Sequence, residues 1–148
     1  MRVSTIQGMS RNLRDGKISS KELTVQALDR ASQINDSIKA FEFIDEERAL
    51  RNASHCDDEL RSGYDRGPLH GIPVGIKDII DVEGWPTQCG SAAYSADPPK
   101  KDAQVVQQLR DAGAVLIGKT VPHELACGVY NHPTRNPWNL DYIPVGSS

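Results

Sequence analysis

The stretch Gly67–Asp78 constrains the fold most, because a loop interrupted by glycine and proline leads into a short apolar segment that ends on a lysine. If residues 72–78 are extended, successive side chains point to opposite faces of a strand. One face then carries Ile72, Val74 and Ile76, and the other carries Pro73, Gly75 and Lys77. The first face is typical of a protein core. The second leaves room beside a glycine for another backbone or a substrate to approach Lys77.

A helix and a second apolar segment follow this strand. Asp102 is the expected N-cap of a helix that extends through Ala112 and stops at Gly113. Residues 114–118 then form a continuous apolar run, which is typical of a buried strand. A strand, a helix and a strand in this order make a crossover unit if the two strands are parallel neighbours in one sheet. The sequence therefore predicts an α/β fold.

The chain before residue 63 is expected to be mainly helical. Ser4–Gln7 and Ser19–Glu22 have the spacing of capping boxes, and each begins a segment with apolar residues at helical spacing. Residues 40–44 alternate like a half-buried strand, and Asp45 follows as the expected N-cap of a third helix. A further short helix is expected from Thr120.

Composition narrows the class of function. With 148 residues, 38% hydrophobic and 25% charged, the chain has the make-up of one globular domain, and its net charge of −3 gives no electrostatic reason to expect nucleic acid or an anionic membrane as a partner. No apolar run reaches the ~18 residues that a membrane span needs, so we expect a cytoplasmic protein. Three widely spaced cysteines favour reduced thiols over a disulfide framework or a zinc cluster.

Four motifs of the sequence belong together: Gly71–Asp78, Asp81–Thr87, Asn136–Asn139 and Pro144–Ser148. In this combination they resemble the amidase signature family, whose members are Ser-cisSer-Lys amidohydrolases. The resemblance extends over essentially the whole chain, and it is most specific at Thr134–Asn139 and at the final Gly-Ser-Ser. Members of that family usually have glycine at the position of Val145. A valine there hinders a close approach of the backbone.

The resemblance implies roles for particular residues. Lys77 would be the general base, and Ser147 would be the bridging serine that relays a proton from the nucleophilic serine. Cys127, Gly128 and Ser148 would contact the substrate. The nucleophile and the oxyanion-hole amides of the family lie beyond Ser148, so the chain would be the N-terminal part of an amidase signature fold, a mixed sheet covered by helices, and would be inactive alone. It would comprise N-terminal helices over 4–62, the lysine strand and crossover unit over 67–118, and the start of the signature loop over 134–148.

The parent enzyme would hydrolyse a linear carboxamide through an acyl-serine intermediate, with no metal or organic cofactor. One alternative is the A subunit of a glutamine-hydrolysing aspartyl/glutamyl-tRNA amidotransferase, which would bring partner subunits in place of a possible homodimer. An alternative of another class is a non-catalytic truncated remnant that acts only through protein interaction. Neither the substrate nor the oligomeric state follows from the sequence.

Other polar and aromatic residues carry weaker signals. His123 and Cys127 are one helical turn apart, but the second histidine of a zinc-binding H-E-x-x-H motif is missing, so helix packing is the simpler interpretation. Asp78 points away from Lys77 on an alternating strand and is expected to make local hydrogen bonds instead of pairing with that lysine. Trp85 and Trp138 could line a pocket or simply pack.

Overall fold

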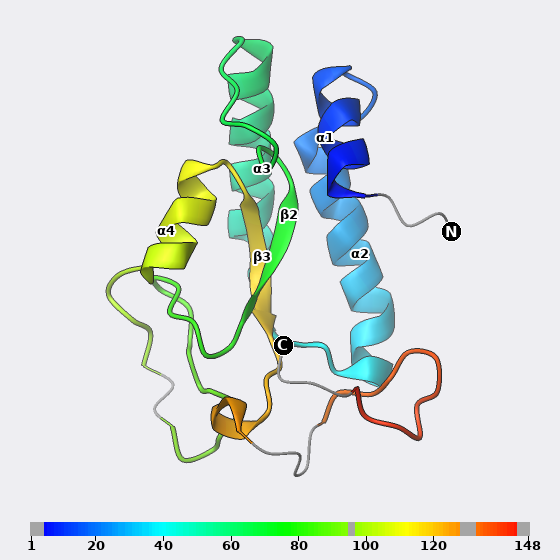
Figure 1. The fold of residues 1–148 in the computed structure, drawn as a ribbon, viewed down its shortest axis with the longest axis vertical. Coiled ribbons are helices and arrows are strands. Elements are labelled where there is room, and N and C mark those ends of the chain that lie inside the picture. The colour runs from blue at the N-terminus through cyan, green and yellow to red at the C-terminus, as the bar shows by residue number, and fades with distance from the viewer. Residues whose placement is uncertain (1–4, 95–96, 128–132, 145–148) are drawn as a thin grey trace.

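The computed structural model describes residues 5–94, 97–127 and 133–144, and it has the α/β architecture expected from the sequence (Figure 1). Helices make up most of its first half, and the second half consists of two strands, a short crossover helix and long connecting loops. The elements in chain order are α1 (Ile6–Arg14), α2 (Ser20–Ile38), β1 (Phe41–Ile44), α3 (Glu46–Arg61), β2 (Pro73–Lys77), α4 (Gln104–Asp111), β3 (Val115–Thr120) and the 3-10 turn η1 (Glu124–Ala126).

The three strands form one mixed sheet in the order β1-β3-β2. β2 and β3 are parallel neighbours, with Pro73 opposite Val115 and Lys77 opposite Thr120, so the predicted crossover unit is confirmed. β1 pairs with β3 in the antiparallel direction. A Cβ on Gly118 would lie 2.2 Å from the Phe43 carbonyl oxygen, which means that only glycine permits β1 to approach β3 this closely.

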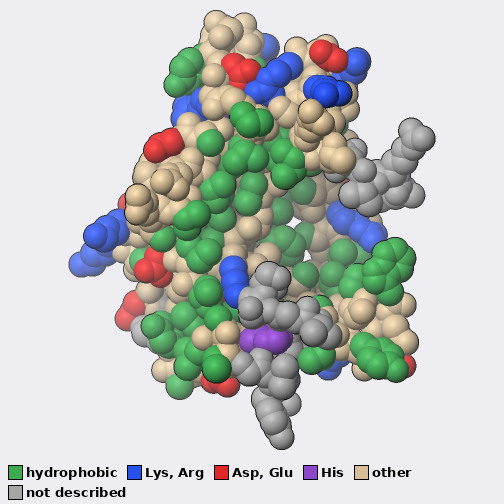
Figure 2. All heavy atoms as spheres, in the orientation of Figure 1, with side chains coloured by type: hydrophobic (Ala, Val, Ile, Leu, Met, Phe, Trp, Pro, Cys, Tyr) green, Lys and Arg blue, Asp and Glu red, His purple; other side chains and the backbone are tan. Residues whose placement is uncertain are grey.

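Helices cover both faces of the sheet. Val115 and Ile117 of β3 pack in one cluster with side chains of α2 and α3, including Leu28 and Ala49. The intervening Leu116 packs on the opposite face with Ile76, Trp85 and Val106, the last from α4. Ile72, expected on the same face as Ile76, instead joins Leu13 and Leu23 in a third cluster beside α1 and α2. Figure 2 shows hydrophobic side chains gathered in a band along β2 and β3 on one face of the molecule.

The helix caps agree only partly with the sequence-based expectations. Ser19 and Glu22 form the predicted capping box of α2, and the Asp45 side chain caps α3 by accepting a hydrogen bond from Arg48 N (3.0 Å). The cap of α1 is Thr5, which accepts from Gly8 N, whereas Ser4 lies outside the described residues. The expectation for Asp102 was wrong.

Asp102 lies two residues before α4, and Ala103 occupies the N-cap position without a side-chain hydrogen bond. The Asp102 carboxylate instead accepts from Glu83 N (2.7 Å) and from Arg110 Nε (2.7 Å). These tertiary partners hold the carboxylate away from the helix end. The helix expected from Thr120 is also different, because β3 continues to Thr120 and a single turn begins only at Glu124. No helix within the described ranges is long and apolar enough to cross a membrane.

Candidate active site at the carboxyl ends of β2 and β3

Lys77 is the last residue of β2 and is half-buried. In a parallel α/β sheet, ligand sites lie beyond the carboxyl ends of the strands, where the loops that follow them converge. Lys77 lies opposite Thr120, the last residue of β3, so both strands end at the same level. In the part of the chain that the structure describes, the Lys77 ammonium forms no ion pair. Its position is therefore compatible with an amine that acts on another group.

Side chains of two neighbouring strands lie close to Gly75. A Cβ on this glycine would lie 3.0 Å from Thr120 Cγ2 and 3.4 Å from Phe41 Cε1. Side chains of β3 and β1 thus border this position, while Gly75 itself stays exposed. A side chain here would crowd these neighbours, on the face of the sheet that Lys77 shares.

The sequence predicted that Asp78, which points away from Lys77 on an alternating strand, does not pair with that lysine, and in the structure it does not. Its carboxylate is buried and forms an ion pair with Lys119, with 2.7 Å between Asp78 Oδ1 and Lys119 Nζ. The other carboxylate oxygen accepts from Gln88 N (3.1 Å), which is the expected hydrogen bond to nearby backbone. Sequence reasoning missed Lys119. The available signal was a lysine directly after the apolar run 114–118, at a position where the strand remains buried.

The loop after β2 folds back over the ends of the strands. Its Trp85 is 1% exposed and donates from Nε1 to Asp45 Oδ2 (2.7 Å), so this tryptophan is a core residue. Ser91 Oγ donates to Glu124 Oε1 (2.7 Å), which connects the loop to η1. Trp138 is 94% exposed, and its segment returns to the end of α2, where Arg135 N donates to Ile38 O (2.8 Å).

The remaining predicted site residues are only partly described. Cys127 is exposed and follows η1 directly, on the segment that leaves the carboxyl end of β3. Gly128, Ser147 and Ser148 lie outside the described residues. The structure therefore places Lys77 and Cys127 at the same end of the sheet, and the roles of all five residues stay predictions.

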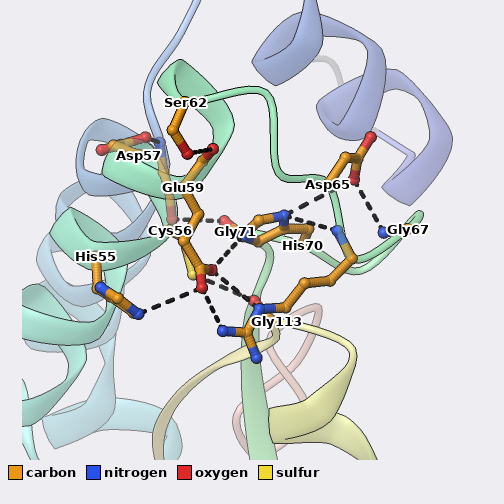
Figure 3. A network of polar contacts seen from close by, with 12 residues as sticks. His55, Cys56, Asp57, Glu59, Ser62, Asp65, Gly67, His70, Gly71 and Gly113 are labelled. Carbon is orange, nitrogen blue, oxygen red and sulfur yellow. Dashed lines mark hydrogen bonds and ion pairs between the residues drawn. The ribbon is translucent and has the colours of Figure 1, made fainter.

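A second polar group lies at the opposite end of β2 and β3 (Figure 3). Glu59 of α3 accepts hydrogen bonds from the Arg66 guanidinium and lies 3.0 Å from His70 Nε2 and 3.3 Å from His55 Nε2. Arg66 N donates to His70 Nδ1 (3.1 Å), and the Cys56 thiol donates to Gly113 O (3.4 Å). A Cβ on Gly113 would lie 2.6 Å from His70 Cδ2, so this glycine makes room for the imidazole ring.

Ligand atoms of Cys56, Glu59 and His70 lie within 4.8 Å of one another, a spacing that a metal ion could use. The hydrogen bonds argue against it. Because a backbone N–H donates to His70 Nδ1, the neutral ring carries its proton on Nε2 and donates it to Glu59, which leaves no lone pair for a metal. The Glu59 carboxylate already accepts from Arg66, and burial raises the pKa of the Cys56 thiol to about 11. This group is a hydrogen-bonded structural network.

Comparison with known proteins places the chain in a family. The Amidase family model matches residues 22–148. The A subunit of glutamyl-tRNA(Gln) amidotransferase from Acidothermus cellulolyticus is 42% identical over 137 residues, which are 89% of this chain and 27% of the relative. The protein of the same name from Desulforapulum autotrophicum is 40% identical over 97% of this chain and 30% of its own length.

Two solved structures share the fold of this chain. The native peptide amidase of Stenotrophomonas maltophilia superposes with a TM-score of 0.89 at 33% identity, over 97% of this chain and 32% of the peptide amidase. A structure described as an amidase gives a TM-score of 0.79 at 38% identity, over 89% of this chain and 31% of that protein. The chain thus spans less than a third of the length of these relatives. The matched family model, the sequence identities and the shared fold together show that this chain belongs to the amidase signature family.

Proposed function

We propose that this chain is the N-terminal part of an amidase that hydrolyses a carboxamide to a carboxylic acid and ammonia or an amine. Lys77 accepts, through Ser147, the proton of a nucleophilic serine located after residue 148. The serine oxygen attacks the amide carbon, the C–N bond breaks, and the leaving nitrogen takes up the proton. Water then hydrolyses the acyl-serine ester. Cys127, Gly128 and Ser148 contact the substrate.

The observation that carries this proposal is the position of Lys77. A half-buried lysine ends a parallel strand, and the adjacent carboxylate of Asp78 is occupied by another lysine. An ion-paired lysine ammonium would be held in its protonated form, whereas a general base must release and accept a proton during turnover. Engagement of Asp78 by Lys119 leaves Lys77 without a carboxylate partner among the residues that the structure describes.

The lengths of the relatives support the view that the catalytic residues belong to a longer chain, of which these 148 residues are one part. The curated relatives are matched over 27 to 31% of their length. The direct test is the nucleotide sequence after codon 148. An open reading frame that encodes further glycine, serine and alanine supports the proposal. A stop codon there would favour the non-catalytic remnant acting through protein interaction.

The catalytic test compares two variants in the longer protein. Lys77→Ala removes the base, and Lys77→Arg retains a positive charge that cannot be deprotonated at a usable pH. Both should lower kcat by roughly 10³-fold, within the range for loss of a general base. Lys100→Arg, a change at an exposed lysine, is the matched control and should keep full activity. Substantial kcat in Lys77→Arg would contradict the general-base role.

The chain of 148 residues should be inactive alone, since the proposed nucleophile and oxyanion donors are not in it. Treatment with an activated fluorophosphonate, followed by mass spectrometry of the intact chain, should show no stoichiometric serine adduct. A clean adduct on Ser147 or Ser148 would mean that one of these residues is itself the nucleophile.

A second candidate function is that of the A subunit of an amidotransferase, in which glutamine is the carboxamide and other subunits use the released ammonia. The observation in its favour is the identity of 36 to 42% to curated proteins of that name. A substrate panel separates the candidates. Ammonia release from glutamine that increases when partner subunits are added supports the amidotransferase, while release from C-terminally amidated peptides by the protein alone supports a free-standing amidase.

A further inference from the structure

Lys119 is a fully buried lysine whose three ammonium hydrogens are matched by three acceptors. Its Nζ lies 2.7 Å from Asp78 Oδ1, 2.9 Å from Pro86 O and 2.9 Å from Thr87 Oγ1. The side chain is 0% exposed, and that of Asp78 is 2% exposed. An ammonium has three donors, so this arrangement satisfies it completely.

The acceptors belong to two segments that meet at the end of β2. Asp78 directly follows Lys77, and Pro86 and Thr87 belong to the loop that folds back over the strand ends. Asp78 makes three further hydrogen bonds. Its N–H donates to Thr120 O (2.9 Å), its carbonyl accepts from Cys89 N (2.9 Å), and its Oδ2 accepts from Gln88 N (3.1 Å). Lys119 is thus the centre of a connection between β3, the residue after Lys77 and the loop 86–89.

Lys119 acts from the face of the sheet opposite to Lys77. In the register of the parallel pair, Lys119 is opposite Ile76, and Thr120 is opposite Lys77. The register of the pair shifts between Val74 and Gly75, which interrupts the simple alternation that starts at Leu116. Residues opposite each other in a register point to the same face, so Lys119 shares the face of Ile76 and Lys77 shares the face of Thr120. Any influence of Lys119 on Lys77 therefore passes through the backbone of residues 77 and 78.

A need for stability alone does not explain this arrangement. The free-energy cost of removing two charges from water offsets most of the attraction between them. Well-packed apolar side chains often replace a buried ion pair without loss of stability. What an apolar pair cannot supply is direction, because a carboxylate and an ammonium with every hydrogen bond satisfied fix the orientation of the backbone that carries them.

We propose that Lys119 is a positioning residue for amide hydrolysis. Through Asp78 it fixes the end of β2, so that Lys77 presents its amine in one orientation, and through Pro86 and Thr87 it holds the loop 86–89 against the same end. This inference rests on the proposed function of Lys77. A displacement of about 1 Å at a reacting group can lower the rate by roughly 10²-fold, which is the size of effect expected here.

The test measures catalysis and folding separately. The values of kcat and KM are measured in the longer protein, and thermal melting is measured both in that protein and in the chain of 148 residues. Lys119→Met is similar in length but leaves the Asp78 carboxylate buried and unpaired. It should lower kcat per folded molecule by roughly 10²-fold with little change in KM. Hydrogen exchange followed by mass spectrometry should show faster exchange of the amides of Gln88 and Cys89, which Asp78 holds.

The double variant Lys119→Met with Asp78→Asn distinguishes positioning from stabilisation, because it removes both charges. We expect it to recover most of the lost melting temperature while kcat stays low. Recovery of both quantities, or a Lys119→Met protein with kcat within about threefold of wild type, would overturn the proposal. If neither variant folds, Thr87→Val removes one acceptor of Lys119 with little change in volume. Unchanged kcat in that variant would overturn the proposal as well.

Lys77→Ala separates the failure of this inference from the failure of the proposed function. If Lys77→Ala is active, the general-base role is wrong whatever Lys119 does. If Lys77→Ala is inactive and the Lys119 variants are not impaired, only the positioning role is wrong.

Discussion

The two ends of the parallel pair β2–β3 both carry networks of buried or half-buried charged and polar side chains, and they differ in how completely the neighbouring charges are paired. At the amino ends, Glu59, His70 and Arg66 satisfy one another, and Arg66 N fixes the tautomer of His70. At the carboxyl ends, Asp78 and Lys119 satisfy one another, and Lys77 beside them has no carboxylate partner within the described residues. Both networks satisfy their own members, and only the one at the carboxyl ends has a lysine without an ion-pair partner beside it, among the described residues.

Residue type alone points to the amino end. Cysteine, glutamate and histidine within 4.8 Å resemble a metal site or a catalytic centre more than a lysine at a strand end does. The hydrogen-bond partners decide otherwise, because every ligand atom of that group is already engaged. The comparison teaches that a candidate site in this fold is recognised by an unengaged group at the carboxyl ends of the strands.

The largest effect should separate the two ends by activity. In the longer amidase proposed above, Lys77→Ala should lower kcat by roughly 10³-fold with little change in melting temperature. His70→Ala should leave kcat per folded molecule within a few fold of wild type, since the network of His70 lies at the far end of the strands. Steady-state kinetics corrected for the folded fraction will check this. A comparable loss of kcat in both variants would remove the distinction between the ends.

His70→Ala should instead lower the free energy of unfolding by about 3 kcal/mol, because it leaves a cavity and an unsatisfied Arg66 N–H. His55→Ala is the matched control on the same carboxylate. The His55 side chain is 67% exposed, so its removal should change stability by less than about 0.5 kcal/mol. Urea denaturation of the two variants measures the difference. Equal effects would mean that the network contributes no more than a surface contact.

Acid should weaken the amino-end network. Hydrogen bonds from Arg66 hold the pKa of Glu59 below its ordinary value of 4.5. Asp65 also borders this network, with Oδ1 3.7 Å from His70 Nδ1, and the hydrogen bond from Gly67 N holds its pKa below 3.8. A carboxylate with a lowered pKa stabilises the fold above its unfolded value and loses this contribution as pH falls through the folded value. Melting temperature should therefore fall below about pH 4.5. Glu59→Gln should melt lower at neutral pH and show a flatter acid dependence, and an unchanged dependence would contradict the assignment.

The smallest effect concerns the thiols. Burial raises the pKa of Cys56 to about 11, whereas Cys127 is exposed. With iodoacetamide at about pH 8, Cys127 should be alkylated first and Cys56 last, because the thiolate is the reacting form.

A cleft of about 170 Å³ lined by Cys56, Glu59 and Arg66 gives access to the network, so zinc could reach it. Stoichiometric zinc binding that protects Cys56 would show that the amino end is a metal site after all.

Local features of the fold could be predicted from the sequence, because they depend on neighbouring residues. The capping box of Ser19 and Glu22, the cap at Asp45 and the strand that ends at Lys77 each involve residues within a few positions of one another. The prediction for Asp102 was wrong because it used only such local signals. Its sequence neighbours indicate a cap, but Arg110 and the backbone of Glu83 compete for its carboxylate in the folded chain.

By itself the sequence determined the α/β class, the family and the candidate lysine, because alternation, helix capping and short motifs are properties of contiguous residues. Only the tertiary structure decided which charged groups are engaged. The pairing of Asp78 with Lys119 and of Glu59 with His70 joins residues from separate elements, and nothing in a linear pattern states that two such side chains meet. Folding removes these groups wholly or partly from water, so each needs a partner from another segment of the chain. The choice of partner is therefore a property of the packed chain.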